Sequence, residues 1–147
     1  MSMQKRKQII WLTGNSGAGK TTLAYGFKKH NSCVILDGDE MRDSISLGAG
    51  FTKEAREEHN LRVARLAKVL LKQNQLVIVS VIAPFRDTRL KLQKIVPIKW
   101  VYLERKLRLA SNKPYEIPME PDLKIDIDKN SKGKCVEIFE DWLLGVK

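Results

Sequence analysis

The chain has 147 residues, of which 43% are hydrophobic, and no apolar run is long enough to span a membrane. We therefore expect one globular domain, residues 1–147, and no membrane as a partner. The net charge of +10 fits either nucleic-acid binding or attraction of small polyanions. Because the basic residues are scattered and form no aromatic–basic stripe, we favour small phosphate ligands over nucleic acid.

Strand-like apolar runs alternate with helix-like segments along the whole chain. The predicted strands are 9–12, 33–36, 76–81, 98–103 and 123–127, and the predicted helices are 20–29, 54–73, 86–95 and 131–144, with Ser131 as an N-cap. This alternation predicts an α/β fold, a three-layer sandwich with a mostly parallel five-stranded sheet. Ligands of such sheets bind at the carboxyl ends of the strands.

A glycine-rich segment joins the first predicted strand to the first predicted helix. It reads Gly14, Asn15, Ser16, Gly17, Ala18, Gly19, Lys20 and Thr21, and Thr22 follows it. Backbone N–H groups of such a loop point at phosphate oxygens, with Lys20 at the β- and γ-phosphates and the Thr21 hydroxyl on the metal ion. The motif in this context predicts a P-loop with ATP and Mg²⁺ as cofactors.

Two carboxylates, Asp37 and Asp39, follow the second predicted strand with Gly38 between them. A phosphoryl acceptor hydroxyl needs positioning and a group that takes its proton, so one carboxylate can face the acceptor while the other faces the metal ion or a cation. We expect Gly38 to let the chain turn sharply between them. An ordinary Asp-Gly turn with solvated acids is the alternative.

Further candidates for binding the acceptor lie before and along the long predicted helix. Arg42 and Arg56 can hold phosphate or sulfate, and Phe51, on a glycine-flanked loop, can stack on a nucleobase. His59 can touch the acceptor or be purely structural, and its spacing is not that of a metal ligand. For Phe51 the alternative is a place in the core, and for each arginine it is the solvated surface.

The longest apolar run ends in a turn that includes Ile82, Pro84 and Phe85. Pro84 makes this turn rigid, and backbone groups there can read a base edge. Phe85 is either part of that site or part of the core. The two cysteines, Cys33 and Cys135, have no metal or redox spacing, so we expect free thiols in a reducing cytoplasm.

These motifs, taken together, resemble the adenylylsulfate kinase family. The matching segments, in family order, are the P-loop with Thr22, Leu36 to Arg42, Gly50 to Thr52, Arg56 to Glu58, Ser80 to Arg86, Pro114 to Pro118 and Pro121 to Leu123. The resemblance implies that ATP phosphorylates the 3′-hydroxyl of a nucleotide ribose. It further implies Asp39 beside that hydroxyl with Asp37 assisting, Arg42 and Arg56 on the acceptor nucleotide, Phe51 on its base, and a homodimer.

Two departures from the family lie on the acceptor side. His59 stands where the family usually has Asn, and Leu61 where it has Arg. The lid region, here 104–113, is also much shorter than in the family; either the lid is absent or replaced, or a segment is missing from this sequence. We therefore favour cytidine diphosphoramidate, a precursor in capsule synthesis, as the acceptor, with adenylylsulfate of sulfate assimilation as the alternative.

Two other classes of function stay open at this point. The acceptor could be a sugar, an antibiotic or a polynucleotide end, although Phe51 and Arg42 favour a nucleotide. The chain could also be a nucleotide- or nucleic-acid-binding protein without catalytic activity. Such a protein would bind ATP without consuming it.

Overall fold

The computed structural model describes residues 7–15, 17–106 and 114–145. Five strands form one sheet: β1 (Ile9–Thr13), β2 (Val34–Asp37), β3 (Val77–Ser80), β4 (Lys99–Glu104) and β5 (Leu123–Asp126). Their order across the sheet is β2-β3-β1-β4-β5, and every neighbouring pair is parallel. The predicted α/β three-layer sandwich is confirmed, with a sheet that is entirely parallel.

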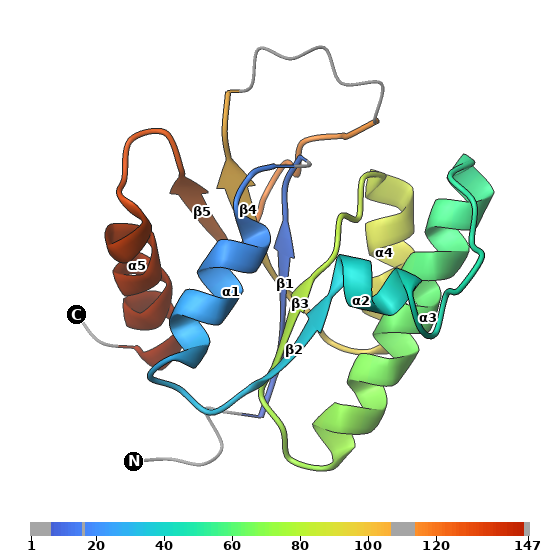
Figure 1. Cartoon of the computed structure of the whole chain (residues 1–147), viewed down its shortest axis with the longest axis horizontal. Helices are drawn as coiled ribbons and strands as arrows, with labels where there is room; N and C mark the ends of the chain where they lie inside the picture. The colour runs from blue at the N-terminus through green and yellow to red at the C-terminus, as the bar shows by residue number, and fades with distance from the viewer. Residues whose placement is uncertain (1–6, 16, 107–113, 146–147) are drawn as a thin grey trace.

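Five helices cover the two faces of this sheet (Figure 1). They are α1 (Lys20–Lys28), α2 (Gly38–Arg42), α3 (Lys53–Lys72), α4 (Arg86–Ile95) and α5 (Lys132–Leu144). Helices α1 and α5 pack on one face and α3 and α4 on the other. Within the described ranges no helix is long and apolar enough to cross a membrane.

Side chains of β1 alternate between the two layers because successive strand residues point to opposite faces. Ile10 and Leu12 join the core under α1 and α5, whereas Ile9 and Trp11 join the core under α3 and α4. All four are at most 1% exposed, so β1 is buried on both faces, as expected for a central parallel strand. This burial holds β1, the strand that directly precedes the P-loop, in place.

One helix was not predicted from the sequence. Asp37 ends β2 and caps α2, since its side chain accepts a hydrogen bond from the Asp39 backbone N–H. Gly38 therefore begins a short helix, and the expectation of a sharp turn at this glycine is wrong. The physical reason is that an N-cap carboxylate satisfies a free N–H at a helix start, which stabilises the first turn. The Ser131 N-cap of α5 is confirmed by its bond from the Lys134 N–H.

The carboxyl ends of β1, β2 and β3 meet at one edge of the sheet. Asp37 at the end of β2 pairs in register with Ser80 at the end of β3. The P-loop follows β1, which lies next to β3 in the sheet. The strand order thus brings three segments distant in sequence to one place.

A chain segment after the undescribed residues 107–113 crosses this edge and is fixed to the turn before α4. The Glu116 N–H donates to the Pro84 carbonyl oxygen at 2.7 Å, and the Glu116 carboxylate accepts from the Arg86 N–H at 2.7 Å. Arg89, which is 7% exposed, donates to the carbonyl oxygens of Ala83 and Glu116 and lies over the Tyr115 ring. Arg89 therefore joins the two segments from a buried position.

We expect Arg89→Met to lower the free energy of unfolding by about 2–4 kcal/mol, because it leaves the buried Ala83 carbonyl oxygen without a donor and removes the bond to the Glu116 carbonyl oxygen. Urea titration of the variant measures this loss. Arg65→Met, at an exposed position of α3, is the matched control and is expected to change stability by less than about 0.5 kcal/mol. Equal stability of both variants would show that Arg89 does not hold these segments together.

Candidate active site

Glycines give the P-loop its path between β1 and α1. Gly19 is the N-cap of α1 with φ of 95°, a left-handed conformation that only glycine adopts without strain. Gly14 lies against β4, where an added Cβ would come within 2.8 Å of the Leu103 carbonyl oxygen. Ser16, also predicted to bind ATP, lies outside the described residues. A side chain would therefore clash with β4 at position 14 and strain the backbone at position 19.

Lys20 is the first residue of α1 and is 8% exposed. Its ammonium donates to the carbonyl oxygens of Gly14 at 3.1 Å and Asn15 at 3.0 Å. The side chain therefore folds back over the loop, and the positive charge lies where the loop would enclose phosphate.

Thr21 lies at the centre of a cluster of oxygen atoms. Its hydroxyl donates to Asp37 Oδ1 at 2.7 Å and lies 3.2 Å from the Ser80 hydroxyl. Within the described ranges no group of three or more His, Cys, Asp or Glu side chains could hold a metal ion. Mg²⁺ fits nevertheless, because it takes hard oxygen donors and completes its shell with phosphate oxygens and water. Thr21, with Asp37 and Ser80 behind it, supplies such donors.

The two carboxylates after β2 differ in their surroundings. Asp37 is buried, and its two oxygens accept from the Thr21 hydroxyl and the Asp39 N–H. Asp39 is exposed in the first turn of α2 and lines the cavity described next. Asp37 is therefore occupied in holding Thr21 and α2, whereas the Asp39 carboxylate is accessible to a ligand.

A cavity of about 440 Å³ joins the P-loop to α2, α3 and the end of β3. Its lining includes the predicted residues Lys20, Thr21, Asp37, Asp39, Arg42, Phe51, Arg56, His59, Ile82 and Pro84. Phe85 does not line it: the residue is the buried N-cap of α4, with the Lys53 ammonium 5.0 Å from its ring centre. The structure thus brings the predicted catalytic and acceptor residues together, apart from Phe85.

Two arginines flank the exposed Phe51 ring in this cavity. The guanidinium carbons of Arg42 and Arg56 lie 4.4 and 5.4 Å from the ring centre. Arg42 also donates to the carbonyl oxygens of Ala49 and Gly50, at 3.4 and 3.2 Å. Burial, and then the charge of Arg56, lower the pKa of Arg42. Two cations held this close form a site for an anion, because an anion would relieve their repulsion.

His59 is a buried residue of the same cavity, 3% exposed. Its Nδ1 lies 2.7 Å from the hydroxyl of Ser46. Burial, with the nearby charges of Arg42 and Arg62, lowers the pKa of His59 to about 4. The imidazole is therefore neutral at physiological pH, so it can form a hydrogen bond with a ligand without adding a positive charge to the cavity.

This burial has a consequence for stability. Between pH 6.5 and 4 the unfolded chain protonates His59 while the folded chain does not, so stability falls as the pH falls through this window. We expect His59 to contribute a loss of about 2–3 kcal/mol over this range, measured by urea titration of wild type and His59→Gln. A wild-type pH dependence identical to that of His59→Gln would contradict the buried neutral imidazole.

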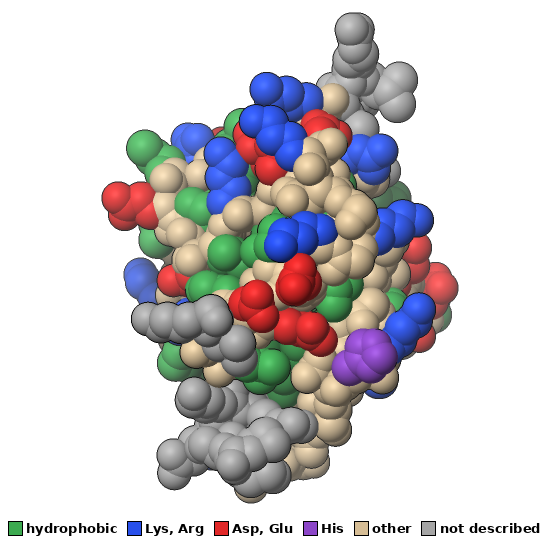
Figure 2. All heavy atoms as spheres, turned by 90° about the vertical axis from the view of Figure 1, so that its left-hand side faces the viewer, with side chains coloured by type: hydrophobic (Ala, Val, Ile, Leu, Met, Phe, Trp, Pro, Cys, Tyr) green, Lys and Arg blue, Asp and Glu red, His purple; other side chains and the backbone are tan. Residues whose placement is uncertain are grey.

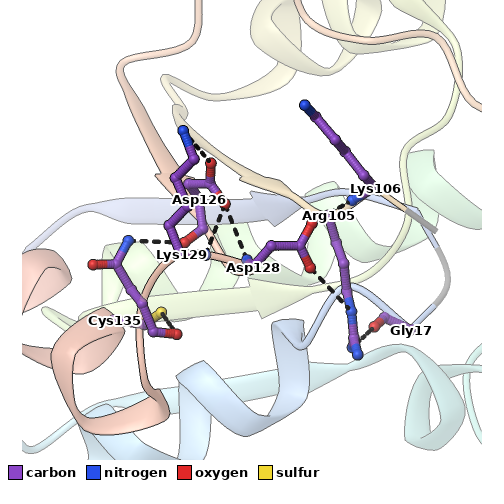
Figure 3. Close-up of polar contacts among 8 residues, drawn as sticks. Gly17, Arg105, Lys106, Asp126, Asp128, Lys129 and Cys135 are labelled. Carbon is purple, nitrogen blue, oxygen red and sulfur yellow. Dashed lines mark hydrogen bonds and ion pairs between the residues drawn. The ribbon is translucent and has the colours of Figure 1, made fainter.

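A second cavity, of about 780 Å³, lies on the other side of the P-loop. It is lined by Thr22, by Arg105 after β4, and by the turn between β5 and α5. Arg105 donates to the Gly17 carbonyl oxygen at 2.8 Å and pairs with Asp128 at 3.8 Å (Figure 3). This cavity adjoins Lys20 and Thr21, as the first one does, but its lining lacks the Asp39 carboxylate, Arg42 and Arg56.

Comparison with known proteins decides the family. The family model described as adenylylsulphate kinase matches residues 6–113. An adenylyl-sulfate kinase of Prochlorococcus marinus is 33% identical over 88% of this chain and 79% of its own, and one of Myxococcus xanthus is 31% identical over 85% of each. The chain belongs to the adenylylsulfate kinase family. It is therefore a phosphotransferase with an alcohol group as acceptor, and it uses ATP with Mg²⁺.

A solved structure supports this assignment. The adenylylsulfate kinase of Mycobacterium tuberculosis, in a cysteine variant, superimposes with a TM-score of 0.79 at 28% identity, over 95% of this chain and 98% of its own. These relatives do not support cytidine diphosphoramidate or capsule synthesis, which we favoured from the sequence. The alternative of that prediction, adenylylsulfate, fits them better.

Several residues of the two cavities were not predicted from the sequence, among them Ser80, Asn60 and Arg105. Ser80 and Asn60 line the first cavity and Arg105 the second. A signal was available for Ser80, which ends a strand next to the P-loop strand. Asn60 and Arg105 carried none, because their roles depend on contacts with Ile82 and Gly17, which are distant in sequence.

Proposed function

We propose that this protein transfers the γ-phosphoryl group of ATP to the 3′-hydroxyl of adenylylsulfate. The observation that carries the proposal is that the exposed Asp39 carboxylate lines one cavity with Lys20, Thr21 and the arginine pair. A donor phosphate, a group that takes a proton and a site for an anionic acceptor thus adjoin one another. The acceptor itself comes from the relatives, which are adenylyl-sulfate kinases.

On the donor side, the P-loop would hold the phosphates and Lys20 would meet the β- and γ-phosphate oxygens. Thr21 would hold Mg²⁺, oriented by the hydrogen bond from its hydroxyl to Asp37. When bound, Mg²⁺ neutralises charge on the phosphate oxygens. Arg105 would keep the P-loop in place through the Gly17 carbonyl oxygen.

On the acceptor side, Arg42 and Arg56 would hold the phosphosulfate group of adenylylsulfate. Asp39 would accept a hydrogen bond from the 3′-hydroxyl and take its proton as the oxygen attacks the γ-phosphorus in line. The phosphoryl group then passes to the ribose oxygen, and ADP leaves with the bond electrons. Lys20 would stabilise the charge that moves onto the β-phosphate.

An assay of ADP release with Mg·ATP and parallel acceptors tests the proposal. We expect turnover with adenylylsulfate and little with gluconate or with ATP alone. Cytidine diphosphoramidate, the acceptor favoured from the sequence, is also assayed. Faster turnover with it than with adenylylsulfate would show that it is the acceptor. Failure of every acceptor, with ATP still bound, would favour a nucleotide-binding protein without catalytic activity.

We also propose that residues 1–147 act as one P-loop kinase domain. The buried free thiols Cys33 and Cys135 fit a reducing compartment such as the cytoplasm.

Lys, Arg, Asp and Glu side chains are interspersed on the face drawn in Figure 2, in keeping with small phosphate ligands rather than nucleic acid. The homodimer stays a prediction, and the part of the lid region at 107–113 lies outside the described residues.

A further inference from the structure

The last residue of β1 is held differently on its two sides. Thr13 pairs in register with Tyr102 of β4, whereas the pairing of β1 with β3 ends at Trp11. Thr13 is fully buried, and its hydroxyl lies 2.9 Å from the hydroxyl of Tyr115, which is 102 residues away in the chain. A side chain distant in sequence thus holds the end of β1 beyond the point where the pairing with β3 has ended.

The Tyr115 ring is itself held by contacts that do not involve its hydroxyl. It stacks on Tyr102, with ring centres 6.2 Å apart and an angle of 14° between the planes, and the Arg89 guanidinium carbon lies 5.1 Å from its centre. The next residue, Glu116, donates its N–H to the carbonyl oxygen of Pro84, which lines the first cavity. Removal of the hydroxyl alone would therefore leave the ring in place.

The residue that follows Thr13 carries a carbonyl group that holds the Lys20 ammonium. Lys20 donates to the Gly14 carbonyl oxygen at 3.1 Å, and Gly14 directly follows Thr13 in the chain. Since the peptide between Thr13 and Gly14 is planar, the position of Thr13 fixes the Gly14 Cα atom, from which this carbonyl group extends. A shift of Thr13 would therefore move the Lys20 ammonium relative to the phosphates that the P-loop encloses.

We propose that Tyr115 is a positioning residue for phosphoryl transfer, because its hydroxyl fixes Thr13 and thereby the Lys20 ammonium relative to the bound phosphates. The inference deepens the proposed function and rests on its transfer of the γ-phosphoryl group from ATP, whichever acceptor takes that group. Tyr115 is not part of the lining of either cavity, so it acts through Thr13 and not by contact with a ligand. Burial raises the pKa of Tyr115 to about 12, so the phenol keeps its hydrogen at physiological pH and the bond to Thr13 persists.

The test removes the hydroxyl and keeps the ring. With whichever acceptor the wild type phosphorylates, we expect Tyr115→Phe to lower kcat by about 3- to 10-fold, the range for one uncharged hydrogen bond, with KM for Mg·ATP within about twofold of wild type. The loss falls on kcat because a displaced ammonium still attracts bound phosphate but stabilises the moving charge less well. Tyr102→Phe is the matched control: within the described residues the hydroxyl of this neighbouring ring has no hydrogen bond, so kcat should not change. Wild-type kcat in Tyr115→Phe would overturn the inference.

Variants of the two residues through which Tyr115 acts separate positioning from a general loss of structure. Thr13→Val should lower kcat as much as Tyr115→Phe does, and the double variant should be no slower than either single variant, whereas Thr13→Ser keeps a hydroxyl and should stay near the wild-type rate. In a Lys20→Ala background, Tyr115→Phe should change the residual kcat by less than about twofold, because the ammonium that it positions is gone. Additive losses in the Thr13 and Tyr115 pair, or a full 3- to 10-fold loss in the Lys20→Ala background, would overturn the inference.

Amide hydrogen exchange, followed by NMR, tests the inference without turnover. If the wild type phosphorylates no acceptor, the proposed function fails, but Tyr115→Phe should still raise the exchange rates of the Gly14 and Asn15 amides by about 3- to 10-fold, because the end of β1 has lost a hydrogen bond. The amides of β5 are the internal control and should exchange as in the wild type. Equal exchange of the Gly14 and Asn15 amides in both proteins would overturn the inference.

Discussion

Lys20→Ala is expected to lower kcat by about 10³-fold or more, because it removes the cation that stabilises charge on the transferring phosphoryl group. The Lys20 ammonium lies within 3.1 Å of two carbonyl oxygens of the loop, which hold it beside the phosphate-binding backbone. Its charge is therefore held where the phosphate oxygens would bind, and this is why its loss should affect kcat so strongly. Steady-state kinetics with Mg·ATP and adenylylsulfate measure the effect.

The fold should survive the Lys20→Ala change. The Ala18, Leu23 and Ala24 side chains around this helix start belong to the apolar core, which the substitution leaves intact. The control is Lys68→Ala, at an exposed position of α3, with wild-type kcat expected. Wild-type kcat in Lys20→Ala, with circular dichroism unchanged, would remove Lys20 from the chemistry.

Asp39→Asn is expected to lower kcat by about 10²-fold or more, the scale of losing a general base. The amide keeps the size of the side chain but cannot take the proton of the 3′-hydroxyl. The KM for ATP should stay near its wild-type value, because Thr21 and Asp37 hold each other without Asp39. Kinetics with varied ATP at saturating acceptor separate the two parameters.

Asp43→Asn is the matched control for this change. Asp43 is the exposed C-cap of the same short helix and does not line the cavity, so its amide should leave kcat unchanged. Loss of kcat in both variants would mean that the charge of α2, and not the Asp39 carboxylate, matters. An unchanged kcat in Asp39→Asn alone would show that the acceptor hydroxyl loses its proton elsewhere.

The parts of the fold that follow from local pattern were predictable from the sequence. The apolar runs predicted the five strands, and the P-loop glycines with Lys20 and Thr21 predicted the connection from the first strand to the helix that begins at Lys20. Helix α2 was missed because five residues are too few for a helical period to show. Its start depends on the Asp37 cap, which reads equally well as a turn.

The parts of the site that depend on distant contacts were not predictable. The neutral state of His59 follows from its burial against Ser46 and the charges of two arginines, and the sequence alone left it either binding or structural. Phe85 could have faced the site or the core, and the structure places it as the buried N-cap of α4, outside the cavity lining. The preference for the acceptor rested on the departures at His59 and Leu61 and on the short lid region, which say that contacts changed but not to what.

The most direct test of the central claim is ³¹P NMR of the product formed from Mg·ATP and adenylylsulfate. We expect a new phosphomonoester signal, with coupling that places it on the ribose 3′-oxygen, while the phosphosulfate signal persists. The signal should be absent when Lys20→Ala replaces the wild-type protein. A product phosphorylated elsewhere, or ATP that stays intact beside adenylylsulfate at saturating concentration, would contradict the account.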